Sequence, residues 1–278
     1  MSDLLNSDYI NSKGEGSIMI PRTIHYCWFG GNPLPPLAKK CIASWKKHCP
    51  DYKIIRWDER NYDLSAAPLY VRQAYELKKW AFVTDYVRLQ VVYDRGGIYM
   101  DTDVELKKAL DPLLHRRAYF GFEDGKAVNT GLGFGAEAKH PILQEMMDDY
   151  KEIPFVKPDG ALDLVPCPQR NTAVFLRHGL RPDDSIQVLD GGVMILPSRF
   201  LNPIDNRTRK MRKTKDMISI HHYSASWQDE ALKKRLRQLQ DEHRREDAFY
   251  NITHAPNRAA MKILGEEKYS WLKGFLKK

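Results

Sequence analysis

A glycine pair between a helical pattern and a short apolar strand is the feature that most constrains this fold. Apolar residues recur at spacings of three and four over residues 71–93, which predicts one long helix. The pair Gly96-Gly97 ends this pattern, because glycine commonly terminates helices. Residues 98–100 then predict a buried strand that leads directly into Asp101-Thr102-Asp103. Ligand sites in open α/β sheets lie at the carboxyl ends of strands, so we expect a site here.

The rest of the pattern favours an α/β fold. A strand, a helix and a second strand are predicted over residues 20–29, 33–49 and 52–57, and this order begins an α/β sheet. The later predictions are strands at 118–122 and 188–196, the second broken at Gly191-Gly192, a glycine-spaced loop or strand at 129–135, a helix at 141–150, and a long loop or small helical excursion at 154–168.

The length of 278 residues suits one large domain with short additions. Residues 1–18 are polar and lack the basic start and apolar stretch of a signal peptide, so we interpret them as a flexible leader. We expect a catalytic domain over 19–228 and a charged helical extension over 229–278. No apolar run approaches the ~18 residues that a membrane-spanning helix needs.

Charge and cysteine content restrict the classes of partner and the compartment. The formal net charge of +8 favours anionic partners, without choosing among nucleotides, nucleic acids and acidic lipids. The four cysteines are irregularly spaced and form no C-x-x-C pair, which argues against a zinc site and favours a reduced, cytoplasmic setting.

The acidic pair has the chemistry of a metal site. Two aspartates one residue apart on a strand project to the same side, and their like charges raise each other's pKa unless a cation lies between them. Mn²⁺ or Mg²⁺ suits such oxygen ligands, although a D-x-D triplet is common by chance. Asp85 and Arg88, three residues apart, share a helix face. They would bind sugar or ribose hydroxyls and a phosphate, or form a surface ion pair.

Two segments carry a resemblance to a known family: Thr84-Asp85-Tyr86-Val87-Arg88, and Asp94-Arg95-Gly96-Gly97-Ile98-Tyr99-Met100-Asp101-Thr102-Asp103. Together they resemble the donor-site signature of the DXD-containing glycosyltransferases of family 32. That family includes bacterial capsular and surface polysaccharide transferases and yeast initiating α-mannosyltransferases, and is related to clostridial glucosylating toxins. The likeness runs over about residues 20–227. It implies a GT-A fold, a Rossmann-like mixed sheet flanked by helices with a helical C-terminal extension, and retaining transfer from a nucleotide sugar.

The resemblance also implies roles for particular residues. Asp101 and Asp103 would serve the metal, with His221 or His222 as a further ligand. The donor-binding residues would be Trp28, which would stack on the base, Phe29 beside it, Asp85, Arg88, Tyr99, Asp101, Asn129, Ser226 and Trp227. Asp85, Arg88, Asp101, Asp103 and Trp227 would form the catalytic set. The alternatives left open are a core position for Trp28, a structural histidine pair and a turn asparagine at 129.

We expect a nucleotide-sugar donor, with uridine favoured over guanosine, and a glycan or lipid-linked oligosaccharide acceptor in polysaccharide biosynthesis. The apolar and basic residues of 269–278, helped by the basic stretch 207–215, suit attachment to an anionic inner membrane surface. Nucleic acid is not an expected partner, because no nucleic-acid motif accompanies the charge. The alternatives are a metal-dependent phosphohydrolase and a basic nucleic-acid-binding protein.

Overall fold

The computed structural model describes residues 19–204, 211 and 214–224. Within these ranges seven strands form one mixed sheet in the order β2-β1-β3-β6-β5-β8-β7. Strand β1 is parallel to β2 and β3, and β5 is parallel to β8, whereas β6 and β7 run antiparallel to their neighbours. The predicted α/β class, a mixed sheet flanked by helices, is confirmed. The predicted leader and C-terminal extension lie outside the described residues.

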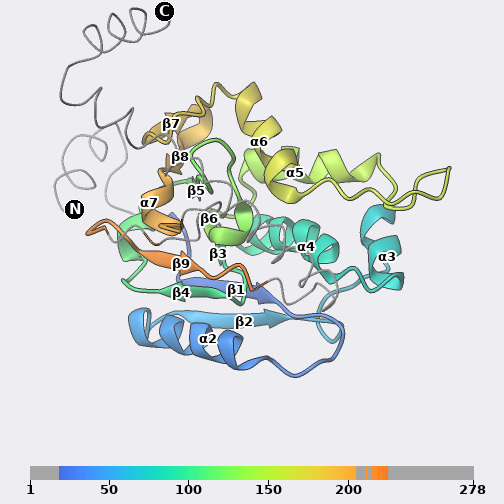
Figure 1. The fold of residues 1–278 in the computed structure, drawn as a ribbon, viewed down its shortest axis with the longest axis horizontal. Coiled ribbons are helices and arrows are strands. Elements are labelled where there is room, and N and C mark those ends of the chain that lie inside the picture. Colours follow the sequence, from blue (N-terminus) through green and yellow to red (C-terminus); the bar gives the residue numbers. More distant parts are fainter. Residues whose placement is uncertain (1–18, 205–210, 212–213, 225–278) are drawn as a thin grey trace, which may run out of the picture. The chain divides into compact units, whose positions relative to one another are not determined.

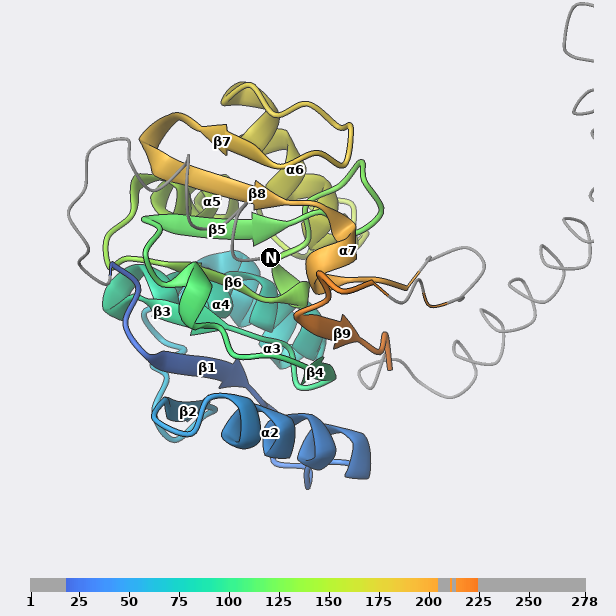
Figure 2. The same ribbon diagram turned by 90° about the vertical axis from the view of Figure 1, so that its left-hand side faces the viewer.

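The first half of the fold places three parallel strands side by side (Figures 1 and 2). In chain order its elements are β1 (Thr23–Cys27), α2 (Pro36–His48), β2 (Lys53–Trp57), α3 (Leu69–Glu76), α4 (Trp80–Arg95), β3 (Gly97–Tyr99) and β4 (Val104–Leu106). Strand β4 leaves the main sheet and pairs with the last described strand, β9 (Ser219–His221), in a separate antiparallel ribbon.

The second half completes the main sheet. Its elements are η1 (Asp111–Leu113), β5 (Ala118–Gly121), η2 (Thr130–Leu132), β6 (Phe134–Ala136), α5 (Pro141–Lys151), α6 (Cys167–Arg177), β7 (Gln187–Leu189), η3 (Asp190–Gly192), β8 (Val193–Leu196) and α7 (Ser198–Leu201). None of the helices in the described ranges combines the length and hydrophobicity that crossing a bilayer requires.

The prediction of one helix over residues 71–93 is wrong, because α3 and α4 are separate helices. Lys78 adopts a left-handed conformation with φ of 56°. The Lys79 amide donates to the Ala74 carbonyl at 2.8 Å and the Lys78 amide to the Tyr75 carbonyl at 2.9 Å, the pattern of a Schellman ending. Glycine usually occupies this position, so a lysine there gave no sequence signal, and the apolar periodicity continued through the break.

Two other segments also differ in detail from the expectation. The proline-rich stretch 154–168 ends in α6, and Pro168 lies in the first turn of that helix, where proline's missing amide is tolerated. The strand predicted over 188–196 is a hairpin of β7 and β8. Gly191 and Gly192 turn the chain there with φ of 75° and 79°.

Side chains on the two faces of the sheet belong to two separate apolar clusters. On β5, Phe120 belongs to the cluster that includes buried residues of α3, α4, α5 and α6. Tyr119, the preceding residue, belongs to the cluster that includes Trp45 of α2 and Phe200 of α7. This alternation follows from the two-residue period of a strand. Helices therefore cover both faces, and the strand ends remain for loops.

The turn between α4 and β3 explains the glycine pair. Gly97 has φ of 107°, and a Cβ there would lie 2.7 Å from the Thr23 carbonyl oxygen. The Trp57 indole donates to His25 Nδ1 at 3.1 Å, and His25 Nε2 donates to the Gly96 carbonyl at 3.0 Å. This chain of hydrogen bonds ties β1, β2 and the turn together. Burial lowers the pKa of His25 to about 4.

The His25 site predicts a loss of stability on mild acidification. The folded state holds His25 neutral down to about pH 4, whereas an unfolded histidine gains a proton below about pH 6.5. The unfolded state therefore binds more protons between these values, and stability falls as pH falls through this window. We expect the unfolding free energy to drop by about 2 kcal/mol from this residue between pH 7 and pH 5. Urea unfolding at pH 7 and at pH 5 measures this drop in the unfolding free energy. A His25→Gln variant should show a smaller drop; an equal drop would contradict the assignment.

Candidate metal and donor site

Asp101, Asp103 and His221 come together at the carboxyl end of β3. The two aspartates directly follow this strand, and His221 ends β9, where it pairs with Val104. His221 Nε2 lies 3.0 Å from Asp103 Oδ1 and 4.0 Å from Asp101 Oδ2. One ligand atom from each residue lies within 4.8 Å of the others. Two carboxylates and one imidazole at this spacing suit a divalent cation.

Each carboxylate of the pair has one oxygen held by the protein. Asp101 Oδ1 accepts a hydrogen bond from the Tyr99 hydroxyl at 2.8 Å. Asp103 Oδ2 accepts from the Ser224 amide at 2.8 Å and from the Ser224 hydroxyl at 2.9 Å. The other two oxygens, Asp101 Oδ2 and Asp103 Oδ1, are the ones nearest His221. Hydrogen bonds of this kind orient carboxylate ligands in metal sites, so the arrangement fits a cation.

The electrostatics of the group indicate a demand for positive charge. Burial by itself would raise the pKa of Asp103, but His221 and the Ser224 donors lower it well below its usual range. Burial by itself would lower the pKa of His221, yet Asp103 and Asp101 raise it above its ordinary value. The His221 side chain is thus placed to supply positive charge beside Asp103. A divalent cation would take over that role and leave the neutral imidazole as a ligand.

Arg88 is a buried cation that holds two acids. Its side chain is 4% exposed, and Nη2 lies 3.0 Å from Asp85 Oδ1 and 3.4 Å from Asp101 Oδ1. Nε donates to the Thr84 carbonyl, and the guanidinium lies over the Tyr99 ring at 5.0 Å. Burial raises the pKa of Asp85 to about 6 despite the neighbouring guanidinium. Because Arg88 and Asp85 are both buried and 3.0 Å apart, they form a buried ion pair, and the alternative of a surface ion pair is wrong. Their contacts with a donor stay predictions.

Tyr99 and Phe29 do not face an open site. Tyr99 is 1% exposed and its hydroxyl donates to Asp101, and its direct contact with a nucleotide stays a prediction. Phe29 packs edge-on against Tyr62 and Tyr75 within the core, because the strand end turns its ring inward. Trp28 is only partly buried, and its indole donates to the Asn32 carbonyl at 2.6 Å. Stacking of a base on Trp28 stays a prediction.

The two histidines have different positions. His222 points to Glu105, with Nε2 2.9 Å from Oε2, and its backbone amide donates to the Asp103 carbonyl. Successive residues at a strand end point to opposite sides, so only His221 joins the two aspartates, and the alternative of His222 as a ligand is corrected. Ser226 and Trp227 lie outside the described residues.

Asn129 is buried and supports the loop beside Asp101. Its Oδ1 accepts from the Gly131 amide at 2.7 Å and caps η2, which agrees with the turn alternative. A contact with the donor sugar stays a prediction. Gly131 itself was not singled out, yet a Cβ there would lie 2.5 Å from Asp101 Oδ2. Ser224 was not predicted either, although it lies between the predicted site residues His222 and Ser226. The glycine spacing of residues 129–135 was the only sequence signal for Gly131.

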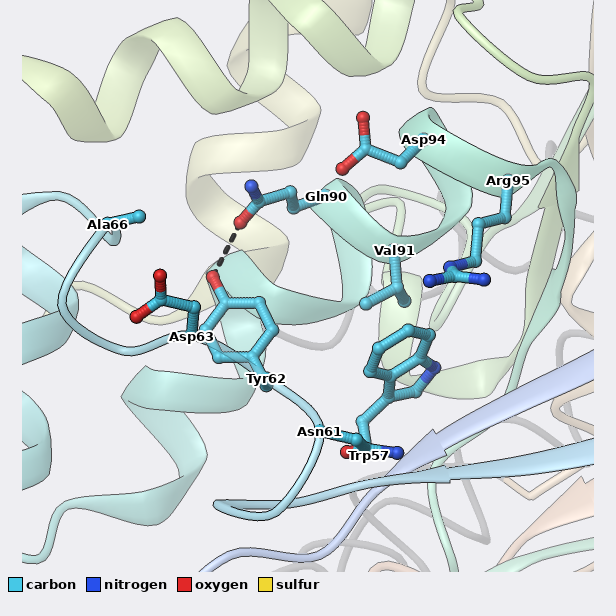
Figure 3. Close-up of a pocket in the computed structure, with 9 residues that line it drawn as sticks. All are labelled: Trp57, Asn61, Tyr62, Asp63, Ala66, Gln90, Val91, Asp94 and Arg95. Atoms are coloured by element: carbon cyan, nitrogen blue, oxygen red, sulfur yellow. Dashed lines mark hydrogen bonds between the residues drawn. The ribbon is translucent and has the colours of Figure 1, made fainter.

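A separate cavity of about 510 Å³ lies between the β2–α3 connection and α4 (Figure 3). In it the Tyr62 hydroxyl donates to Gln90. None of its lining residues belongs to the acidic group or to the predicted donor site. The lining residues are Trp57, Asn61, Tyr62, Asp63, Ala66, Gln90, Val91, Asp94 and Arg95.

Comparison with known protein families identifies the segment that contains the acidic pair. Residues 35–120 match the family described as "Glycosyltransferase sugar-binding region containing DXD motif". This match confirms the resemblance to DXD-containing glycosyltransferases for the segment that holds Asp85, Arg88, Asp101 and Asp103. The segment ends well before His221.

Curated relatives and solved structures are similar over parts of the chain. Inositol phosphoceramide mannosyltransferase 1 of Schizosaccharomyces pombe is 30% identical over 53% of this chain and 47% of its own length. Inositol phosphoceramide mannosyltransferase 3 of the same yeast is 27% identical over 55% and 44%. The chain thus spans about half the length of these relatives. Among solved structures, the PaToxG glycosyltransferase covers 57% of this chain and 68% of its own, with 21% identity and a TM-score of 0.43.

The buried ion pair predicts a strong coupling between Arg88 and Asp85. Arg88→Leu should lower the unfolding free energy by about 3 kcal/mol, because it leaves a buried carboxylate without its partner. Asp85→Asn in the same chain should recover part of this loss, since an amide carries no charge. Urea unfolding of the two single variants and the double variant gives the coupling. Additive losses would contradict a direct interaction.

Proposed function

We propose that this chain, in which residues 35–120 match the DXD-containing sugar-binding region of glycosyltransferases, is a metal-dependent glycosyltransferase that retains anomeric configuration. One observation carries the proposal. Asp101 Oδ2 and Asp103 Oδ1 both lie near His221 Nε2, while the other oxygen of each carboxylate is held by the protein. Such support prepares a site for a cation without using the atoms that would bind it.

The proposed ligands are Asp101, Asp103 and His221, with Mn²⁺ favoured and Mg²⁺ as the alternative. Carboxylates suit both ions, and the imidazole favours the transition metal. When bound, the cation would neutralise negative charge on the departing nucleoside diphosphate. Arg88 and Tyr99 orient Asp101, and Ser224 orients Asp103. Trp28 would stack on the base, and Ser226 and Trp227 would close over the diphosphate.

A front-face reaction is the proposed route to retention. Asp85 is buried and paired with Arg88, which makes it a poor nucleophile for a covalent intermediate. The acceptor hydroxyl would instead attack on the side from which the diphosphate departs. It would form the new glycosidic bond as the sugar–phosphate bond breaks, and its proton would pass to a diphosphate oxygen. We propose a uridine nucleotide rather than a guanosine nucleotide as the carrier.

The proposed acceptor is a glycan or a lipid-linked oligosaccharide in polysaccharide biosynthesis. The names of the yeast relatives include inositol phosphoceramide, a phosphorylated sphingolipid. This supports the proposal of an acceptor that is anchored in a membrane. Peripheral attachment at the inner face of the membrane would bring the enzyme to it. The net charge of +8 suits an anionic surface.

Incubation with a panel of UDP- and GDP-sugars plus Mn²⁺ tests the function. Slow release of the nucleoside diphosphate from one donor would support a glycosyltransferase. Cleavage of simple phosphate esters instead would favour a phosphohydrolase. A phosphohydrolase would need further acidic residues to bind a second metal. The nearby Glu105 already pairs with Lys40, Lys107 and His222. Binding of DNA or RNA with a steep salt dependence would favour a nucleic-acid-binding protein.

Substitution of the proposed ligands should abolish metal binding and activity together. Asp101→Asn and Asp103→Asn should each weaken Mn²⁺ binding by about 100-fold and slow donor hydrolysis at least as much, because second-sphere changes alone cost about 10–100-fold. Calorimetric Mn²⁺ titration measures binding independently of activity. His221→Gln should also weaken binding, whereas the neighbouring His222→Gln serves as the matched control. Equal effects of the two histidine changes would contradict the proposed ligand set.

Gly131→Ala should impair the site without unfolding the protein. The added Cβ would lie 2.5 Å from Asp101 Oδ2 and 3.0 Å from Asn129 Oδ1, so the carboxylate must shift. We expect about 10-fold weaker Mn²⁺ binding, as for other changes that reorient a ligand. Gly179→Ala is the control: its φ of 81° strains an alanine, so it costs stability, but its Cβ meets nothing within 4 Å, and Mn²⁺ affinity should not change. Unchanged affinity in Gly131→Ala would show that this oxygen is not a ligand.

A further inference from the structure

Helix α2 presents an exposed face whose charged residues are all lysines. Its buried side is formed by Ala38, Cys41 and Trp45. The exposed side carries Lys39, Lys40, Ala43, Lys46 and Lys47, and no acidic residue occurs within the helix. The spacing of these positions places them along one stripe of a helix. We call these four lysines the α2 lysine face.

Three of these lysines have no acidic partner in the described part of the chain. Lys39, Lys46 and Lys47 make no ion pair there, whereas Lys40 lies 3.2 Å from Glu105. Lysines in the last turn, such as Lys46 and Lys47, interact favourably with the helix dipole. Lys39 and Lys40 lie near the amino end, where the dipole disfavours cations. Helix stability therefore does not account for the face as a whole.

The α2 lysine face lies close to the candidate metal site. The Trp45 indole donates to the Val104 carbonyl at 2.7 Å, and Val104 directly follows Asp103. Lys40 and His222 both contact Glu105 Oε2, and the His222 amide donates to the Asp103 carbonyl. Figures 1 and 2 both show α2 at one end of the described fold, and Figure 2 shows β4 beside it. Helix α2 thus packs against β4, the strand that follows the acidic pair, and Lys40 links the lysine face to Glu105 of that strand.

We propose that the α2 lysine face docks the protein on an anionic membrane surface through lipid phosphates. The stripe from Lys39 to Lys47 spans about 12 Å, at 1.5 Å per residue, which is long enough to meet several headgroups at once. Lysines near such a surface each strengthen binding by about fivefold. The purpose of this docking rests on the proposed function. Docking would hold the donor site near a membrane-anchored acceptor.

Vesicle co-sedimentation of the full chain tests the proposal without measuring sugar transfer. The chain should bind vesicles of phosphatidylcholine and phosphatidylglycerol in equal parts, should not bind pure phosphatidylcholine, and should lose affinity as salt rises. The variant Lys39→Gln/Lys46→Gln/Lys47→Gln should bind about 100-fold more weakly, at about fivefold per lysine. Lys40 is left unchanged because it contacts Glu105.

A charge-matched variant separates this face from net charge. Lys79→Gln/Lys126→Gln/Lys157→Gln removes three exposed lysines from other parts of the fold, and it should retain most of the affinity. Equal losses in both variants, or full affinity in the α2 variant, would overturn the proposal. So would tighter binding to soluble heparin than to the anionic vesicles. Without vesicles, the α2 variant should hydrolyse the donor and unfold in urea as the unchanged protein does, which would show that its site and fold are intact. Failure of docking is therefore distinguishable from failure of the proposed function.

Discussion

The buried guanidinium of Arg88 is the interaction on which the acidic end of β3 depends. Asp85, Asp101 and Asp103 bring three carboxylates to one region, and burial of such charges is costly unless they are paired. Arg88 pairs with Asp85 and Asp101, and its guanidinium lies over the ring of Tyr99. His221 balances the third. The fold therefore carries its own positive charges at the place where we propose a metal ion.

The candidate site uses two separate parts of the chain. The acids and Arg88 belong to the segment that matches the DXD sugar-binding region, residues 35–120. His221 and Ser224 come from far beyond it and are brought in by the pairing of β9 with β4. The match alone would thus contain two of the three proposed ligands. The pairing supplies the nitrogen ligand and the two hydrogen bonds that orient Asp103.

Local sequence signals were enough to predict the position of the acidic pair. Gly96 and Gly97 must be glycine because of a close turn, and the short strand after them is apolar on both faces. The strand, helix and strand that open the fold were also predictable from periodicity. What could not be predicted is the direction in which single side chains point. Which of His221 and His222 faces Asp103 depends on the register with β4, and the burial of Phe29 depends on rings from distant segments. The end of α3 at a lysine lacked the usual glycine signal.

The pairing of β4 with β9 also affects the order in which the protein can become competent during its synthesis. The main sheet from β1 to β8 is made of residues that precede the last described strand. Domains generally begin to fold from the amino end as the ribosome releases them. Asp103 gains its partners only when residues 221–224 emerge. A nascent chain can therefore assemble most of its sheet while its acidic pair stays incomplete, and a metal ion would be captured only near the end of translation of the described domain.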